Sequence, residues 1–182
     1  EFTLINAWFE SVSGYTTTGG TILQDIEALP KSLLFWRSST HFIGGIGVVV
    51  FMLLILPMVS TIKMRLSKLE MTSLSKENYR FRTKEAIRVI SSVFVGLTIF
   101  SAAAYMLAGM DWFDAINHAF STAATGGFST RNASIGAFDS FPVELVSVVF
   151  MLVGGMHFGL IYATVAERSF KLFTSPVTKY YL

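Results

Sequence analysis

The sequence predicts an all-α integral membrane protein built from repeats, each a membrane-spanning helix, a short re-entrant segment and a second membrane-spanning helix. Charged residues make up 14% of the 182 residues, whereas soluble domains usually carry about 25%. Three stretches without Asp, Glu, Lys or Arg each exceed the roughly 20 residues that a helix needs to cross a bilayer. A Thr/Gly motif also occurs twice, each time ahead of such a stretch. A soluble core is the alternative, but three apolar helices would leave so short a chain little polar surface.

The spanning helices are predicted at about Ser38–Leu56, Val89–Ala108 and Pro142–Ala166. Eight of the 14 Lys and Arg residues gather between the first two, so the positive-inside tendency places residues 58–88 in the cytoplasm as a basic loop. They are Lys63, Arg65, Lys68, Lys76, Arg80, Arg82, Lys84 and Arg88. The first helix then runs inward, the second outward and the third inward again, which leaves residues 172–182 as a cytoplasmic tail.

Two further uncharged segments are too short to span the membrane. Each begins with helix-forming residues, at about Ile5–Gly14 and Phe113–Ala123, and each ends in Thr and Gly. Irregular backbone at membrane depth is tolerated only where it is buried in protein or lines a watery cavity. We therefore expect two re-entrant pore loops.

The two halves of the chain repeat. TTTGG at Thr16–Gly20 matches AATGG at Ala123–Gly127 with an offset of 107, and FIGGIGVVVF at Phe42–Phe51 matches LVGGMHFGLI at Leu152–Ile161 with an offset of 110. Residues 1–57 then form a first-repeat pore helix, filter loop and inner helix, and residues 89–171 form a complete second repeat. Because the first copy lacks its leading spanning helix, we expect the chain to be a piece of a longer protein.

The two loops offer the chemistry of a potassium site. A potassium ion that leaves water can exchange its hydration shell for backbone carbonyl oxygens, which add no fixed charge. Gly allows the backbone conformations that aim successive carbonyls at one axis, and Thr adds a hydroxyl and a stiff side chain. The C-terminal ends of the two short helices would add partial negative charge. The predicted ion-binding residues are Thr16, Thr17, Thr18, Gly19, Gly20, Ala123, Ala124, Thr125, Gly126 and Gly127.

Other chemistry finds little support in the residues. The net charge of +2 is too small to indicate a nucleic-acid partner, and the absence of Cys excludes disulfides and thiolate metal sites. No HExxH-like spacing indicates a transition-metal site, and no Walker motif or Ser/His/Asp arrangement indicates an enzyme.

Several residues near the loops have a structural and a functional interpretation. The three histidines lie in or near helices, and for His157, which sits among glycines in the third spanning helix, packing is preferred to a functional role. For the Gly-Gly pairs in the spanning helices, close helix packing is preferred to a hinge. Three acidic residues near the predicted outer mouth either attract cations or simply start helices and loops. These residues are His41, His118, His157, Gly44, Gly45, Gly47, Gly154, Gly155, Gly159, Asp111, Asp114 and Asp139.

FESVSGYTTTGGTIL, LPKSLLFW, FIGGIGVVV and AGMDWFDAINHAFSTAATGGFSTRNASIGAFDS resemble the Trk/Ktr superfamily of potassium-uptake proteins, nearest to its TrkH branch. The resemblance covers nearly the whole chain and is densest at Phe9–Pro57 and Ala108–Ser140. It implies four repeats in one polypeptide around a pseudo-fourfold pore, with one key filter Gly in each. Here those glycines would be Gly19 and Gly126, and Gly at position 19 would favour potassium over sodium.

The resemblance further implies a multi-pass protein of the cell inner membrane, a homodimer, and a cytoplasmic nucleotide-binding regulatory subunit. With two of four loops, these residues alone should not conduct. Ala123 and Ala124 replace two Thr of the first loop, so we expect an asymmetric ring with looser selectivity. A non-conducting membrane scaffold and a potassium or sodium carrier remain the alternatives.

Overall fold

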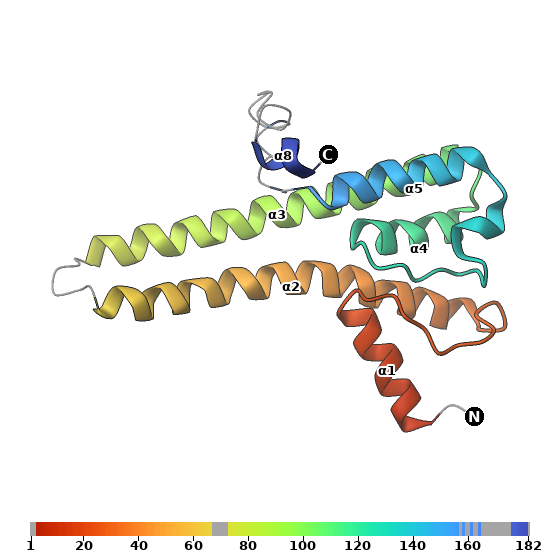
Figure 1. Ribbon diagram of the computed structural model, residues 1–182, viewed down its shortest axis with the longest axis horizontal. Helices are drawn as coiled ribbons and strands as arrows, with labels where there is room; N and C mark the ends of the chain where they lie inside the picture. Colours follow the sequence, from red (N-terminus) through yellow and green to blue (C-terminus); the bar gives the residue numbers. More distant parts are fainter. Residues whose placement is uncertain are drawn as a thin grey trace. The chain divides into compact units, whose positions relative to one another are not determined.

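The computed structural model describes residues 3–66, 73–156, 158, 161, 164 and 176–181. Every regular element in these residues is a helix, which confirms the all-α fold class (Figure 1). The elements are α1 (Leu4–Tyr15), α2 (Lys31–Leu66), α3 (Ser73–Leu107), α4 (Trp112–Ala123), the 3-10 helix η1 (Ser134–Phe138), α5 (Phe141–Gly154) and α8 (Pro176–Tyr181). The chain divides into two units, Glu1–Ile46 with Phe94–Met156, and Gly47–Val93 with His157–Leu182. Both Thr/Gly motifs lie in the first unit, which is the one described below.

The two short helices lie where the sequence predicts them. α1 begins after Thr3, whose hydroxyl accepts a hydrogen bond from the Asn6 N–H at 3.3 Å. α4 begins after Asp111, whose carboxylate accepts one from the Phe113 N–H at 3.1 Å. Such caps satisfy N–H groups that have no partner within the helix. Asp111 is therefore a helix-start residue, one of its two predicted interpretations.

Two of the predicted spanning helices are longer than expected. Ile87–Leu107, within α3, is the one segment among the described residues that is long and apolar enough to cross a membrane, with mean hydropathy 1.9. It matches the second predicted span. The first predicted span lies within α2. The predicted basic loop is helical up to Leu66 and again from Ser73, because its Lys, Arg and Glu residues are good helix formers, and residues 67–72 lie outside the described part.

The third predicted spanning helix is interrupted. α5 ends at Gly154, and the N–H of Gly155 bonds to the Met151 carbonyl at 3.1 Å. A continuous helix through Pro142–Ala166 is therefore wrong at this point. Gly154 and Gly155 weaken the helix here, since each Gly costs a helix about 1 kcal/mol relative to Ala, although α2 continues through the equivalent pair Gly44 and Gly45. Most residues after Met156 lie outside the described part.

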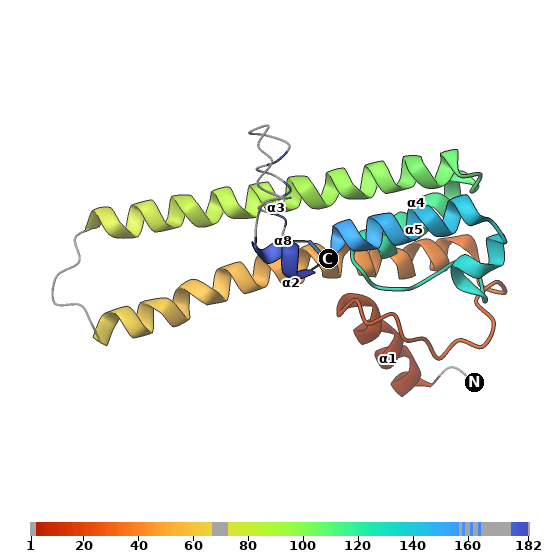
Figure 2. The same ribbon diagram turned by 45° about the horizontal axis from the view of Figure 1, so that its top comes forward.

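A buried tyrosine joins three helices of the first unit. Tyr105 of α3 is fully buried, and its hydroxyl lies 2.8 Å from Thr122 Oγ1 of α4 and 2.9 Å from Ser147 Oγ of α5. Buried polar groups of this kind need partners, and this trio supplies them. Figures 1 and 2 both show α4 beside α5.

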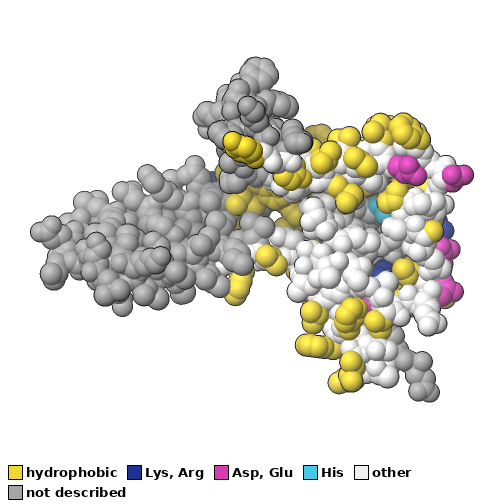
Figure 3. Space-filling model, viewed as in Figure 1, with side chains coloured by type: hydrophobic (Ala, Val, Ile, Leu, Met, Phe, Trp, Pro, Cys, Tyr) yellow, Lys and Arg dark blue, Asp and Glu magenta, His cyan; other side chains and the backbone are white. Residues whose placement is uncertain are grey.

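The outer faces of α1 and α5 are apolar. Figure 3 shows hydrophobic side chains gathered over both helices, including Leu4 and Trp8 of α1 and Phe141 and Val148 of α5, all more than half exposed. An apolar surface of this extent fits a bilayer or neighbouring helices better than it fits water.

Candidate ion-binding loops

The two Thr/Gly loops follow the same backbone path, but with an offset of 108 rather than 107. α1 is capped at Thr16 and α4 at Ala124. The three N–H groups at each helix end bond to carbonyls at equivalent positions. In loop one these bonds are Thr16 N to Val12 O (2.9 Å), Thr17 N to Gly14 O (3.1 Å) and Thr18 N to Ser13 O (3.0 Å). In loop two they are Ala124 N to Phe120 O (3.3 Å), Thr125 N to Thr122 O (3.1 Å) and Gly126 N to Ser121 O (2.8 Å).

This pattern is a Schellman motif with an unusual residue in it. The left-handed position after the cap is usually Gly, but here it is Thr17, with φ 54°, and Thr125, with φ 51°. A β-branched residue in this conformation is a genuine outlier and is disfavoured by roughly 1–2 kcal/mol. Strain of this kind tends to occur at functional sites.

The glycine that matches Gly19 is therefore Gly127. Gly19 has φ 75° and Gly127 has φ 114°, whereas Gly126 is not among the positive-φ residues. The pairing of Gly19 with Gly126 was wrong by one residue, because matching the letters TTTGG and AATGG ignores where each helix ends. Gly126 instead occupies the place of Thr18.

The corrected pairing changes which hydroxyls distinguish the loops. In loop one, Thr16 Oγ1 donates to the Val12 carbonyl at 2.7 Å and lies 2.8 Å from Thr18 Oγ1. Their counterparts in loop two are Ala124 and Gly126, so this hydroxyl pair exists only in loop one. Thr17 and Thr125 are equivalent, so the strained Thr is common to both loops.

A serine of each pore helix tethers its own loop. Ser13 Oγ donates to the Gly20 carbonyl at 2.6 Å. Ser121, its counterpart, accepts a hydrogen bond from the Gly127 N–H at 2.8 Å. Both serines are buried. The loops are therefore held from behind by side chains of the helices that lead into them.

Segments that leave the loops are held at a second equivalent pair of positions. The Glu10 carboxylate accepts from Thr21 Oγ1 at 2.9 Å. His118 lies at the corresponding position of α4, and its Nε2 lies 2.9 Å from Oγ of Ser129, the counterpart of Thr21. A carboxylate and an imidazole thus serve the same purpose in the two repeats.

Arg37 of α2 connects the first repeat to the second loop. Its Nε donates to Glu10 Oε1 at 2.6 Å, and its Nη1 donates to the Ser129 carbonyl at 3.0 Å. Its guanidinium carbon lies 3.7 Å from the centre of the Phe128 ring. Arg37 is only 7% exposed, so these contacts act in a water-poor environment, where they are strong and where losing one partner is costly.

His41, one turn further along α2, completes the contact between repeats. It is fully buried, its Nδ1 lies 3.2 Å from Ser121 Oγ, and its ring stacks on Phe128 with centroids 4.1 Å apart. A Cβ added to Gly126 would overlap the His41 ring. His41 and His118 are therefore buried residues packed between helix and loop, although Nε2 of His41 has no hydrogen-bond partner among the described residues. His157, for which packing is the preferred interpretation, lies outside the described residues.

The two loops lie against one another at their glycines. A Cβ added to Gly19 would overlap the carbonyl oxygen of Gly126. Gly44 and Gly45 of α2 also allow close packing, whereas a Cβ added to Gly154 of α5 would make only ordinary van der Waals contacts. A Cβ on Gly44 would lie 2.8 Å from the Tyr15 carbonyl carbon, and one on Gly154 would lie 3.6 Å from the Ala123 oxygen. Each inner helix thus packs on the end of its own pore helix, while Gly47 has open space around it.

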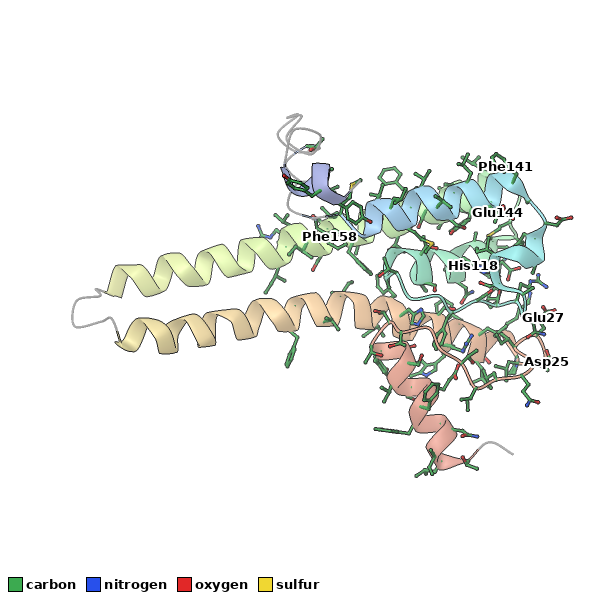
Figure 4. The ribbon with its side chains drawn as sticks, in the orientation of Figure 1. Asp25, Glu27, His118, Phe141, Glu144 and Phe158 are labelled. Atoms are coloured by element: carbon green, nitrogen blue, oxygen red, sulfur yellow. The ribbon has the colours of Figure 1, made fainter. Side chains whose placement is uncertain are left out.

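Acidic residues lie at the end of the unit away from the loops. Figure 3 shows acidic side chains there, where Figure 4 labels Asp25, Glu27 and Glu144. Asp25 accepts a hydrogen bond from Asn132 Nδ2 at 2.9 Å, which lowers the pKa of the Asp25 carboxyl.

Asp114 is not a free charge at a pore mouth. It is 4% exposed and accepts from Thr130 Oγ1 at 2.7 Å and from Arg131 Nη2 at 2.7 Å. The hydrogen bond from Arg131 to Asp114 raises the pKa of the Arg131 guanidinium. The cation-attracting interpretation of Asp114 is therefore wrong, and the residue anchors the segment that follows loop two.

Sequence reasoning located both loops but missed the side chains that hold them. Glu10, Ser13, Arg37, Ser121 and Phe128 were not singled out, although the offset of 108 would have paired Ser13 with Ser121. No spacing pattern could have joined Arg37 to Phe128, since that contact crosses from one repeat to the other.

The family model for TrkH, described as "Cation transport protein", matches residues 1–181. The chain belongs to the TrkH family.

TrkH-family relatives match almost the whole chain. Trk system potassium uptake protein TrkH of Escherichia coli (strain K12) is 41% identical over 172 residues, covering 94% of this chain and 36% of the relative. TrkH of Halomonas elongata is 42% identical over 164 residues, covering 90% and 34%. The crystal structure of the potassium transporter TrkH from Vibrio parahaemolyticus has a TM-score of 0.74 and 38% identity, covering 98% of this chain and 34% of that one. The chain is thus an all-α membrane protein of the TrkH family and spans about a third of the length of these relatives.

Proposed function

We propose that the two loops form part of a potassium-conducting filter in the full-length protein. The observation that carries this proposal is the shared backbone path, 108 residues apart, in which a strained Thr and a left-handed Gly follow the C-terminal end of a short helix. Because two different sequences adopt the same strained conformation, we infer that the function of both loops requires this backbone path. Coordination of a cation by carbonyl oxygens is such a requirement.

The surroundings of the loops favour a cation over an anion. The last turns of α1 and α4 contain no basic residue, and a helix C-terminus carries about half a negative charge. The proposed ion-binding residues are those from Thr16 to Gly20 and from Ala123 to Gly127, with Gly19 and Gly127 as the equivalent glycines. The ligand is potassium, with no transition metal and no catalytic step required.

The remaining features of the proposal concern the whole protein. Residues 1–57 supply the end of one repeat, residues 89–171 supply a second, and two further loops complete a pseudo-fourfold ring. The protein spans the cell inner membrane several times with residues 58–88 and 172–182 in the cytoplasm. It forms a homodimer and receives a nucleotide-binding regulatory subunit on that side. The names of the potassium-uptake relatives support the potassium-transport part of this proposal.

Rubidium and sodium uptake by the full-length protein, in cells lacking other potassium uptake, would test the proposal. Gly19→Ser and Gly127→Ser are each expected to lower the rubidium-to-sodium uptake ratio by about tenfold, equivalent to about 1.4 kcal/mol. Gly136→Ser is the matched control, because Gly136 is exposed in η1 with nothing within 4 Å of an added Cβ. If both filter variants behaved like this control, the non-conducting scaffold would be the better account.

A further inference from the structure

A cavity of about 180 Å³ lies beside the second loop. Its walls include Thr122 of α4, and Ser147 and Met151 of α5. It is bounded entirely by residues of the first structural unit. Thr125, Gly126 and Gly127 of the second loop line it as well.

The corresponding space in the first repeat is filled by a ring from the second. Phe128 is 2% exposed and lies against three residues of that repeat. A Cβ added to Gly14 would come within 3.3 Å of the Phe128 ring. The Arg37 guanidinium lies 3.7 Å from the ring centre, and the His41 ring stacks on it at 4.1 Å.

Through the internal repeat, the residues around the Phe128 ring correspond to residues that line the cavity. The offset of 108 in the pore helices takes Gly14 to Thr122. The offset of 110 in the inner helices takes Arg37 to Ser147 and His41 to Met151. All three counterparts line the cavity. Ser147 and Thr122 are buried like their counterparts, but Met151 is 53% exposed where His41 is fully buried, so the open part of the cavity lies at Met151.

Three polar side chains in the cavity wall, those of Ser147, Thr122 and His118, already have hydrogen-bond partners within the protein. Ser147 Oγ donates to the Val143 carbonyl at 2.9 Å and pairs with Tyr105, which also pairs with Thr122. Both ring nitrogens of His118 lie within hydrogen-bond distance of protein oxygens, at 2.7 and 2.9 Å. An apolar group could therefore enter without leaving these groups unpaired. A cavity of roughly 150 Å³ is known to hold a benzene ring.

We propose that this cavity is a socket for an aromatic side chain from a third loop, which lies outside residues 1–182 and in which an aromatic residue follows a Gly. That side chain would pack on the second repeat in the way that Phe128 packs on the first. In the first repeat the ring stacks on a guanidinium and an imidazole. In the second, the smaller Ser147 leaves room for the ring, and the Met151 thioether can contact its edge, a favourable sulfur–aromatic arrangement. The socket would thus couple neighbouring repeats whether or not the loops conduct.

An experimental structure of the full-length protein would test the socket directly. The expected result is an aromatic side chain from a third loop enclosed by Thr122, Ser147 and Met151. Ordered water, lipid or a non-aromatic side chain in that space would overturn the proposal. This readout does not depend on transport, so the socket and the filter can fail separately.

A filling variant gives a second test in the same protein. Met151→Trp should lower the melting temperature by several degrees, because its indole would compete with the resident ring. Val149→Trp is the matched control, since Val149 lies on the opposite side of α5 and is 46% exposed, and its melting temperature should change little. A Met151→Trp protein as stable as wild type, or more stable, would show that the cavity is empty in the full-length protein and would contradict the proposal.

Discussion

The first and second Thr/Gly loops share a backbone path and a tethering serine, Ser13 or Ser121, but differ in the other side chains that support them. In loop one the Thr16 and Thr18 hydroxyls pair with each other, and Glu10 binds Thr21 in the segment that follows the loop. Loop two has no such pair and is held by His118 and Ser121. The comparison teaches that the end of the pore helix determines the loop conformation. The supporting side chains can therefore differ in chemistry, provided that each segment keeps a partner.

The largest expected effect comes from the residue that serves both loops. Arg37→Met would remove the cationic partner of the Glu10 carboxylate, whose side chain is 11% exposed, and a donor to the Ser129 carbonyl. We therefore expect the full-length protein to lose about 3–5 kcal/mol of stability. Denaturant or thermal unfolding in detergent would measure this loss, and rubidium uptake should fall with it.

A double variant that also changes Glu10 tests the same prediction further. Glu10→Gln combined with Arg37→Met leaves no uncompensated charge, so the double variant should be more stable than Arg37→Met alone. Lys31→Met is a control, because exposed Lys31 lies 5.2 Å from the Phe113 ring and should contribute at most about 1 kcal/mol. Equal losses for Arg37→Met and Lys31→Met would mean that the connection between repeats is unimportant.

Gly126 and Gly127 should respond to Ala for different reasons. Gly126→Ala overlaps the His41 ring and should cost about 1–3 kcal/mol through overpacking. Gly127→Ala meets only the Gly19 Cα, at 3.9 Å, so its cost comes from its positive φ, roughly 1–2 kcal/mol. His41→Ala should rescue Gly126→Ala and leave Gly127→Ala unchanged in unfolding experiments. Rescue of both variants, or of neither, would contradict the assigned register.

Sequence alone predicted the fold class, the two pore helices and both loops, because apolar length and Thr/Gly composition are local signals. It misaligned the second loop by one residue, since the letters TTTGG and AATGG align without reference to the last hydrogen bond of each helix. It also extended the third span through Gly154 and Gly155. The contacts of Arg37 and His41 with Phe128 could not be predicted, because they depend on how two repeats pack.

The serine tethers should have a moderate and unequal effect. Ser121→Ala removes the acceptor for the Gly127 N–H and the partner of His41, so we expect a cost of about 1–2 kcal/mol and a lower rubidium-to-sodium ratio. Ser13→Ala removes one hydrogen bond to the Gly20 carbonyl and should cost about 1 kcal/mol. Unfolding and uptake measurements on both variants would show which serine contributes more. A larger effect of Ser13→Ala than of Ser121→Ala would contradict this prediction.

The smallest expected effect is a change at the strained Thr of either loop. Thr17→Gly and Thr125→Gly relieve the left-handed strain but free the backbone, so each should change stability by about 1 kcal/mol or less. Because the two residues are equivalent, both variants should lower ion selectivity to a similar degree. A selectivity loss confined to one of them would show that the loops do not contribute alike.

Anomalous diffraction from rubidium-soaked crystals of the full-length protein tests the central claim most directly. The account predicts rubidium bound between the two loops, at a level where backbone oxygens of residues 108 apart, such as Thr18 and Gly126 or Gly19 and Gly127, contact the same ion. Ions bound by residues 107 apart would restore the register read from the letters alone. Rubidium bound elsewhere, with neither loop in contact, would contradict the assignment of these loops as an ion filter.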